Sequence, residues 1–336
     1  MSWFGVRRHS GPAAFSTEGR LPGFDGATGW LNSPPLTAED VRGKVVLVDF
    51  WTYTCINWLR TLAYVRAWAE TYQDRGLIVV GVHTPEFPFE RDVDNVSRAV
   101  QEMRVEYPVA LDSDYAVWEA FSNRYWPAVY IADADGRIRH HHFGEGGYEE
   151  GEGVIQRLLR DAGSDGIPDD LVVVGDDGFE AQADWPNLES PETYLGYDQA
   201  QRFASPGGAR LAQARAYVAP ERLKLNQWAL EGEWTVERGA SVLAGADGRI
   251  AFRFHARDVH LVMGPPARGT TVPFVVSVDG EPPGRGHGLD VDERGHGTLS
   301  EQRLHQMIRE RGPIIERTFE IAFLAPGAEA YAFTFG

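Results

Sequence analysis

The segment from residue 44 to residue 58 constrains the fold of this 336-residue chain more than any other. Residues 44–50 form an apolar run typical of a buried strand, and after a short turn Cys55 opens a stretch with helical spacing. Cys55 is also the only cysteine, so the chain has no second thiol for an internal disulfide. Any redox product of Cys55 is therefore a sulfenic acid, a mixed disulfide with another thiol, or a bridge to a second chain.

The first half of the chain alternates strand-like and helical stretches. A hairpin turn at 133–136 leads into a strand at 137–143, and a last helix is expected at about 149–162. Alternation on this scale predicts a largely parallel α/β sheet that helices cover on both faces. The remaining strands are expected at 44–50, 77–82 and 128–132, and the remaining helices at 55–74, 91–104 and 114–122.

The second half has a different texture. Residues 163–190 are acidic and rich in Gly and Pro, which predicts a linker whose apolar run at 171–174 is a candidate strand. Beyond the linker, short alternating runs separated by Gly, Pro and Asp predict a β-sandwich, jelly-roll and carbohydrate-binding-module-like in type. These runs lie at 233–237, 249–254, 258–263, 272–279, 317–324 and 329–335.

The length of the chain fits two domains, and an apolar fraction of 43% is enough for a core in each. We predict an irregular leader at 1–40, an α/β domain at 41–162, the linker at 163–190 and the β-sandwich domain at 191–336.

The net charge of −17 limits the classes of partner. An acidic surface repels phosphate backbones and anionic lipid, so neither nucleic acid nor a membrane surface is expected to bind. No stretch approaches the roughly 18 apolar residues of a spanning helix, and residues 1–10 contain no apolar signal-peptide core. We expect a cytoplasmic protein, or an exported one if an upstream segment has been removed.

Cys55 is the main candidate for chemistry. The N-terminus of a helix lowers the pKa of a cysteine thiol through its unpaired N–H groups and its dipole, and the thiolate is the reactive form. We therefore expect a reactive thiol with a lowered pKa. The alternative is a buried and inert cysteine, a common state for an unpaired thiol.

Several motifs around Cys55 resemble one family. The run Val46–Trp51, with Cys55 four residues later, looks like the active-site strand and turn of thioredoxins. The run 51–62 more closely resembles the C-terminal redoxin region of DipZ-type proteins, which are related to TlpA and AhpC/TSA-like redoxins. Residues 83–87 and 123–128 also match, and the similarity extends from about residue 20 to the C-terminus. The resemblance implies a thioredoxin-like fold for the first domain.

The resemblance also implies roles for individual residues. Cys55 matches the nucleophile, and Asp49 matches the buried acid that moves protons during disulfide exchange. Pro127 matches the proline that is cis in this fold and faces the thiol. Together with Trp51 and Trp126, Pro127 is a candidate substrate contact.

Trp58 is where the chain departs from the family. A second cysteine normally stands here and releases the substrate from the mixed disulfide, so the usual dithiol reductase route is excluded. An adduct on Cys55 must wait for an external thiol such as glutathione or a protein thiol. Trp58 is either a filler over the start of the helix or, through its indole, part of the substrate site.

Two polar residues are further catalytic candidates. Thr52 precedes Cys55 by three residues, as in the Thr-x-x-Cys arrangement of peroxiredoxins, although Val48 replaces the usual proline. Arg60 and Arg124 are only candidates for the arginine of that arrangement. Glu86 follows a strand at the end where parallel sheets carry their sites, and is a candidate general base.

Other groups carry weaker signals. His140 and His142 share a strand face, but no other ligand accompanies them, so we predict a solvated edge strand, no metal and no cofactor. Aromatic residues of the β-rich half could stack on sugar rings if they were exposed, although alternating aromatics are more often core. These are Trp228, Trp234, Tyr331 and Phe333.

The sequence thus favours a thiol-disulfide oxidoreductase or a one-cysteine peroxidase that acts through Cys55. The competing hypothesis is a redox-inactive scaffold whose β-sandwich binds a carbohydrate or a protein.

Overall fold

A computed structural model describes residues 18–175 and 177–336, so the predicted leader is only partly covered. The described chain forms two compact units. The first contains the residues up to Trp51 together with Tyr64–Thr84 and Val105–Val173, and the second contains Thr52–Ala63, Pro85–Arg104 and Val174–Gly336. The predicted domain limits at 41, 162 and 190 remain predictions.

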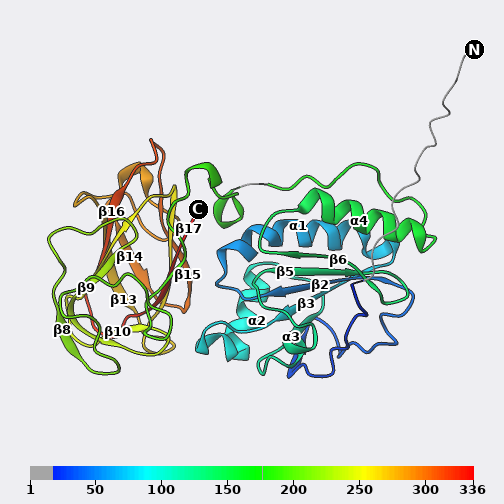
Figure 1. The fold of residues 1–336 in the computed structure, drawn as a ribbon, viewed down its shortest axis with the longest axis horizontal. Coiled ribbons are helices and arrows are strands. Elements are labelled where there is room, and N and C mark those ends of the chain that lie inside the picture. The colour runs from blue at the N-terminus through cyan, green and yellow to red at the C-terminus, as the bar shows by residue number, and fades with distance from the viewer. Residues whose placement is uncertain (1–17, 176) are drawn as a thin grey trace, which may run out of the picture. The chain divides into compact units, whose positions relative to one another are not determined.

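The first unit is built on a six-stranded sheet (Figure 1). In the order β1-β4-β3-β2-β5-β6, only the pairs β2–β3 and β3–β4 are parallel, so the prediction of a largely parallel sheet was wrong. The sheet is mixed because a hairpin adds β6 and β5 runs antiparallel to β2. The strands are β1 Gly29–Leu31, β2 Val45–Trp51, β3 Leu77–His83, β4 Val109–Leu111, β5 Ala128–Ala132 and β6 Ile138–Phe143.

Helices occupy the predicted positions. The α-helices are α1 Ile56–Tyr72, α2 Val93–Glu102, α3 Ala116–Ala120 and α4 Tyr148–Asp161. Short 3-10 helices are η1 Gln73–Arg75, η2 Pro88–Arg91, η3 Gly178–Glu180, η4 Trp185–Asn187 and η5 Gly284–Gly286. Within the first unit, α4 and the second half of α1 lie over one face of the sheet, and α3 lies on the other (Figure 1).

Strand β2 lies at the centre of the first unit, and all seven of its residues are buried. Val46, Val48 and Phe50 point to one face, where they pack in a hydrophobic cluster with residues of α3 and β5. The intervening residues, including Asp49 and Trp51, therefore point to the opposite face. Burial on both faces explains why the strand reads as a continuous apolar run.

The run at 171–174 is not a strand, which corrects the prediction. The backbone N–H of Val172 donates to both carboxylate oxygens of Glu152 in α4, at 3.0 and 3.1 Å. The Val172 N–H therefore bonds to a side chain of α4 and not to a neighbouring strand. The Val173 side chain next to it is 95% exposed.

The C-terminal region forms a large, curled antiparallel sheet of eleven strands. The first part of β9 pairs with β11 and its last part with β10, and the chain turns between them at Gly232, which has a φ of 94°. A side chain there would be strained by this φ and crowded by Gly248, whose Cα lies 3.0 Å from an added Cβ. The strands are β7 Thr193–Tyr194, β8 Arg215–Tyr217, β9 Trp228–Val236, β10 Ser241–Leu243, β11 Arg249–Phe254, β12 Asp258–Gly264, β13 Val272–Val278, β14 His296–Leu299, β15 Arg303–Arg309, β16 Arg317–Phe323 and β17 Glu329–Phe335.

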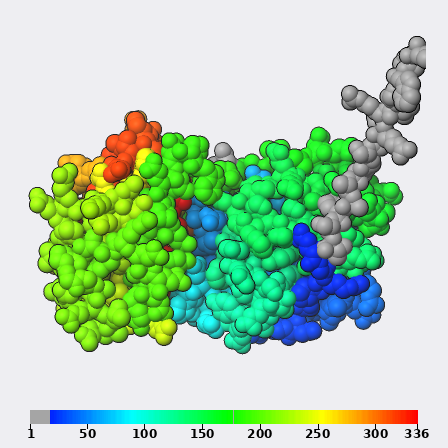
Figure 2. Space-filling model, viewed as in Figure 1, coloured from blue at the N-terminus to red at the C-terminus, as the bar shows by residue number. Residues whose placement is uncertain are grey.

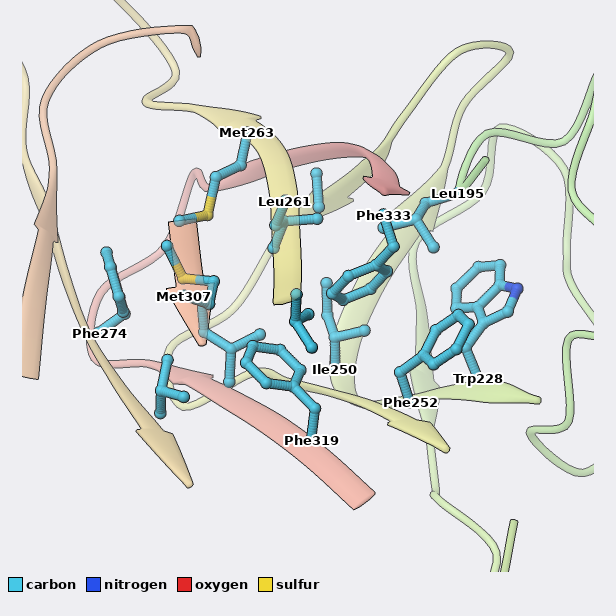
Figure 3. Close-up of a cluster of buried hydrophobic side chains, with 14 of the residues drawn as sticks. Leu195, Trp228, Ile250, Phe252, Leu261, Met263, Phe274, Met307, Phe319 and Phe333 are labelled. Atoms are coloured by element: carbon cyan, nitrogen blue, oxygen red, sulfur yellow. The ribbon is translucent and has the colours of Figure 1, made fainter. Parts of the chain in front are cut away.

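The curled sheet encloses one core (Figure 3). Phe252 and Phe319 from one half of the sheet meet Phe333 from the other half, with ring centroids 5.1 and 5.6 Å apart. Trp228, Trp234, Tyr331 and Phe333 are all buried, so these rings offer no surface for stacking on a sugar. The aromatic glycan site considered from the sequence is therefore not formed by these residues.

Long loops between β7 and β9 form much of the surface of the second unit in Figure 2, where they are yellow-green. Across the described ranges, no helix combines the length and apolar character needed to cross a membrane.

Replacing Phe252 by Ala should strongly destabilise the C-terminal sheet. Removing a ring that is fully buried between the two halves should lower the free energy of unfolding by about 3–5 kcal/mol. Urea unfolding followed by tryptophan fluorescence measures this change. The control is Leu324→Ala, at a side chain that is 52% exposed, which should cost well under 1 kcal/mol. Equal losses for the two variants would contradict the assigned core.

Candidate functional site

Cys55 stands where helix α1 begins, as the sequence predicts. Its backbone N–H donates to the Thr52 carbonyl at 3.2 Å, which closes the turn after β2. Its own carbonyl accepts from the Leu59 N–H at 3.0 Å, the first hydrogen bond of the helix. These two hydrogen bonds fix the backbone of Cys55, and the residue as a whole is half-buried.

The pKa of the Cys55 thiol is raised well above its usual range, which corrects the expectation of a lowered pKa. Burial is the main cause, and the negative charges of Glu86 and Glu192 add to it. The backbone N–H groups of Asn57 and Trp58 act in the opposite direction but are outweighed. The thiol is therefore predominantly protonated at neutral pH, and an attack through sulfur requires a proton acceptor.

Two carboxyl groups near the thiol share one tyrosine hydroxyl. The Tyr194 hydroxyl forms a short hydrogen bond to Oε1 of Glu86 and lies 3.3 Å from Oε2 of Glu192. One hydroxyl has a single proton, which the two carboxyls share, and two negative charges this close together would repel each other. We call Glu86, Glu192 and Tyr194 the acid group.

The acid group holds a proton near neutral pH. Burial raises the pKa of Glu86 to about 8, helped by the charges of Glu192 and Glu90. The pKa of Glu192 is also raised through loss of water around its carboxyl, although the residue as a whole is exposed. A carboxyl that titrates in this range can accept a proton from a thiol and return it, which supports the prediction of Glu86 as a general base.

Glu90, which the sequence analysis missed, connects the turn before Cys55 to the loop that carries Glu86. Its Oε1 accepts from the Thr54 hydroxyl at 2.6 Å, and its Oε2 accepts from the backbone N–H groups of Glu86 and Phe87 at 2.6 and 2.8 Å. Glu90 is buried at the third position of η2, where its bond to the Phe87 N–H forms one half of a capping box. Glu90 is thus a positioning residue, and without Ser or Thr at position 87 the sequence shows no capping signal here.

Aromatic rings lie close to these carboxyls and account for their desolvation. The Tyr331 ring centroid lies 5.2 Å from that of Phe87 and 4.8 Å from that of Phe89. Phe87 also lies 6.3 Å from Tyr194, within the acid group. Phe87 follows Glu86 directly, and burial is the main cause of the raised pKa of Glu86.

Asp49 and Trp51 are fully buried on β2, in the first unit. The charge of Asp49 contributes, after burial itself, to the raised pKa of Tyr107. Gly81 of β3 leaves room for these rings, because an added Cβ would lie 2.8 Å from Trp51 and 2.9 Å from Tyr107. Trp51 therefore acts in packing and presents no surface to a substrate.

Trp126 and Pro127 also lie in the first unit, and the peptide bond between them is cis, as the resemblance implies. Pro127 is buried, and Trp126 is half-buried with its indole N–H donating to the Thr84 carbonyl at 3.1 Å. The role of Trp126 and Pro127 in substrate binding stays a prediction.

The remaining candidates lie as follows. Thr52 and Trp58 are fully buried, which agrees with Trp58 as a filler and not as a substrate contact. Arg60 is buried with its Nε donating to the Ala181 carbonyl at 3.1 Å, and Arg124 is exposed in the first unit.

The three histidines of β6 lie on an edge strand, as predicted. In the described ranges, no three His, Cys, Asp or Glu side chains are arranged to hold a metal ion.

Comparisons with known proteins agree with the expected resemblance. Residues 21–141 match the AhpC/TSA family, and residues 190–336 match a thioredoxin-like C-terminal domain. The chain is 39% identical over 277 residues to protein DipZ of Mycobacterium tuberculosis, covering 81% of this chain and 38% of DipZ. It is 31% identical over 139 residues to thiol-disulfide oxidoreductase YkuV of Bacillus subtilis, covering 41% of this chain and 93% of YkuV. The solution structure of a thioredoxin-like protein in the oxidized form is similar over 44% of this chain and 97% of its own, with 31% identity and a TM-score of 0.39.

Glu86→Gln should lower the pKa of Cys55, because it removes one of the charges that raise it. Alkylation by iodoacetamide between pH 7 and pH 10 measures this pKa. We expect the midpoint of the profile to move to lower pH and the rate at pH 9 to rise several-fold. Glu70→Gln, at an exposed position of α1, is the matched control and should leave the profile in place. An unchanged profile in both variants would remove Glu86 from the electrostatics of the thiol.

Proposed function

Because this chain belongs to the thioredoxin-like redoxin family, we propose that it is a thiol-disulfide oxidoreductase that acts through Cys55 alone. The observation that carries the proposal is the acid group beside a half-buried cysteine at the start of α1. A carboxyl with a pKa of about 8 can exchange a proton with the thiol, and a cysteine that serves only in packing would not use such a group. The chain spans 38% of the length of the DipZ proteins, so the proposal concerns this chain only.

The proposed reaction is a pair of thiol-disulfide exchanges. Glu86 accepts the thiol proton, and the Cys55 sulfur attacks a disulfide R–S–S–R′ to form Cys55–S–S–R. The leaving R′–S⁻ takes up the proton, which the acid group is placed to return. An external thiol R″–SH then attacks the adduct, giving R–S–S–R″ and restoring the Cys55 thiol. The sum of the two steps is R–S–S–R′ + R″–SH → R–S–S–R″ + R′–SH, so one thiol is consumed, one is released and the number of disulfides is unchanged.

The protonated state of Cys55 bears on both candidate reactions. Peroxide reduction also begins from the thiolate, and would give a sulfenic acid that one external thiol converts to the mixed disulfide with loss of water. The thiolate is disfavoured here by burial and by two carboxyls. Both reactions therefore need the acid group to accept the thiol proton, and thiol-disulfide exchange is the main reaction we propose because the relative YkuV is a thiol-disulfide oxidoreductase. The rate of exchange should rise with pH through about 8 as Glu86 becomes a carboxylate acceptor.

We further propose that the C-terminal sheet serves the thiol site and not a glycan. The strand β7, which pairs with β17, carries Tyr194 and follows Glu192 directly. The jelly-roll form of this sheet also stays a proposal, which the curl of the eleven strands supports.

Cys55→Ser should reduce turnover to the background rate, since a hydroxyl does not exchange with disulfides. The assay is reduction of the glutathione mixed disulfide of 2-mercaptoethanol with glutathione as the reductant, and circular dichroism verifies folding. Retained turnover in a folded variant would overturn the proposal and favour the redox-inactive scaffold.

Trp58→Cys should create a two-cysteine site and add dithiol reductase activity, measured as faster reduction of insulin by dithiothreitol. Because the indole is fully buried, the variant should also lose about 3–5 kcal/mol of stability. Trp58→Ser is the matched control, since it leaves a similar cavity without the second thiol. If the cysteine variant folds but is no faster than the serine variant, the surroundings of Cys55 do not support dithiol exchange.

A further inference from the structure

A pocket of about 560 Å³ begins at the acid group and extends away from the site described above. Glu192 and Tyr194 belong both to the pocket wall and to the acid group, so the pocket begins where the proton-exchanging site ends. The pocket is lined by Pro191, Glu192, Thr193, Tyr194, Asp198, Gln199, Gln201 and Arg202. Its volume is within the range of pockets that bind small molecules.

The backbone of the pocket is fixed by the core beneath it. The Gln201 carbonyl accepts from the indole N–H of Trp228 at 2.9 Å, and the Arg202 carbonyl accepts from the Trp228 backbone N–H at 3.3 Å. Trp228 is fully buried in the C-terminal core. Arg202 has a left-handed φ of 58°, so these two anchors hold a backbone conformation that side-chain sterics alone disfavour. The wall is therefore preorganised, which lowers the entropic cost of binding.

The polar groups of the pocket suit a peptide that carries a free carboxylate. Asp198 is already paired with Arg238, at 2.9 Å. The guanidinium of Arg202 is exposed and makes no ion pair within residues 18–175 and 177–336. This leaves one guanidinium to bind a carboxylate, and the amides of Gln199 and Gln201 to hydrogen-bond a peptide.

We infer that this pocket binds the small thiol that resets Cys55, and that this thiol is a short peptide carrying a free carboxylate, of the glutathione type. The inference rests on the proposed function and names its reductant. The bound thiol attacks the Cys55–S–S–R adduct, forms the disulfide with R, and leaves Cys55 as a thiol once the acid group has supplied the proton. Arg202 holds the carboxylate of the incoming peptide.

The overall charge makes Arg202 more important than an exposed arginine usually is. The net charge of the chain is −17, so an anionic peptide thiol is repelled over most of the surface. One unpaired guanidinium in a preorganised pocket beside the acid group provides local attraction. A neutral thiol such as 2-mercaptoethanol has no carboxylate for Arg202 to bind, and this difference provides the test.

The experiment measures how fast each thiol resets the full-length chain after Cys55 has been converted to its glutathione mixed disulfide. The readout is the ratio of the glutathione rate to the 2-mercaptoethanol rate, followed by intact-mass spectrometry. Arg202→Gln should lower this ratio about tenfold, equivalent to about 1.4 kcal/mol of lost binding. Arg210→Gln, at an exposed position outside the pocket, is the control and should keep the wild-type ratio.

The outcomes separate this inference from the proposed function. If neither thiol resets the wild-type adduct, the proposed function fails. If both thiols reset it and Arg202→Gln leaves the ratio unchanged, the function stands and the pocket is not the thiol site. An equal fall in the ratio for Arg210→Gln would mean that only the net charge matters, which also overturns the pocket.

Discussion

The removal of the Cys55 thiol from water, next to two carboxyl groups, is the constraint on which the chemistry of this protein depends. In water a thiol at the start of a helix ionises readily, and here desolvation by protein and the negative charges of Glu86 and Glu192 reverse that tendency. The same burial raises the pKa of Glu86 to about 8, so the acceptor and the thiol are affected together. A protein that must wait for an external thiol gains from a cysteine that stays protonated, since the thiolate is the form that oxidises most readily.

The site is assembled from three separate stretches of chain, which Glu90 and Tyr194 hold together. Glu90 binds the turn before Cys55 and the loop of Glu86 through one carboxyl, and Tyr194 brings the β7 segment to Glu86. These segments, residues 52–63, 85–104 and those from 174 onward, form one compact unit. The residues of the predicted α/β domain that carry the chemistry thus fold with the C-terminal sheet. Local hydrogen bonds to buried carboxyls make this grouping specific, because each lost bond would leave a buried polar group without its partner.

The sequence predicted those parts of the fold that depend on local periodicity. The run at 44–50 became β2, and the helical spacing after Cys55 became α1, because burial of a whole strand and of one helix face leaves a readable pattern. Strands of two or three residues, such as β1, β4 and β7, are too short to show one. Strand β15 was missed for a different reason: its buried His305 and Gln306 interrupt the apolar alternation.

Of the candidate site, Cys55 and Glu86 could be found from the chain itself, whereas Glu192 and Tyr194 could not. Both lie more than a hundred residues away in sequence, and only the antiparallel pairing of β7 with β17 places them. The error in the pKa of Cys55 has the same origin. A helix start can be read from sequence, but the desolvation and charges that dominate the pKa come from segments distant along the chain.

The replacement of the second cysteine by Trp58 agrees with this arrangement. In a two-cysteine site the second thiol lies in the same helix turn as the first. Folding already holds the two thiols together, so no further entropy is lost when they react. Here the indole fills that position completely, so the second thiol must be captured from solution in every cycle. Capture requires a binding surface within reach of the sulfur and a proton source at the point of exchange. The acid group supplies the proton, and its extension into the wall of the 560 Å³ pocket puts both requirements on β7 and the residues beside it.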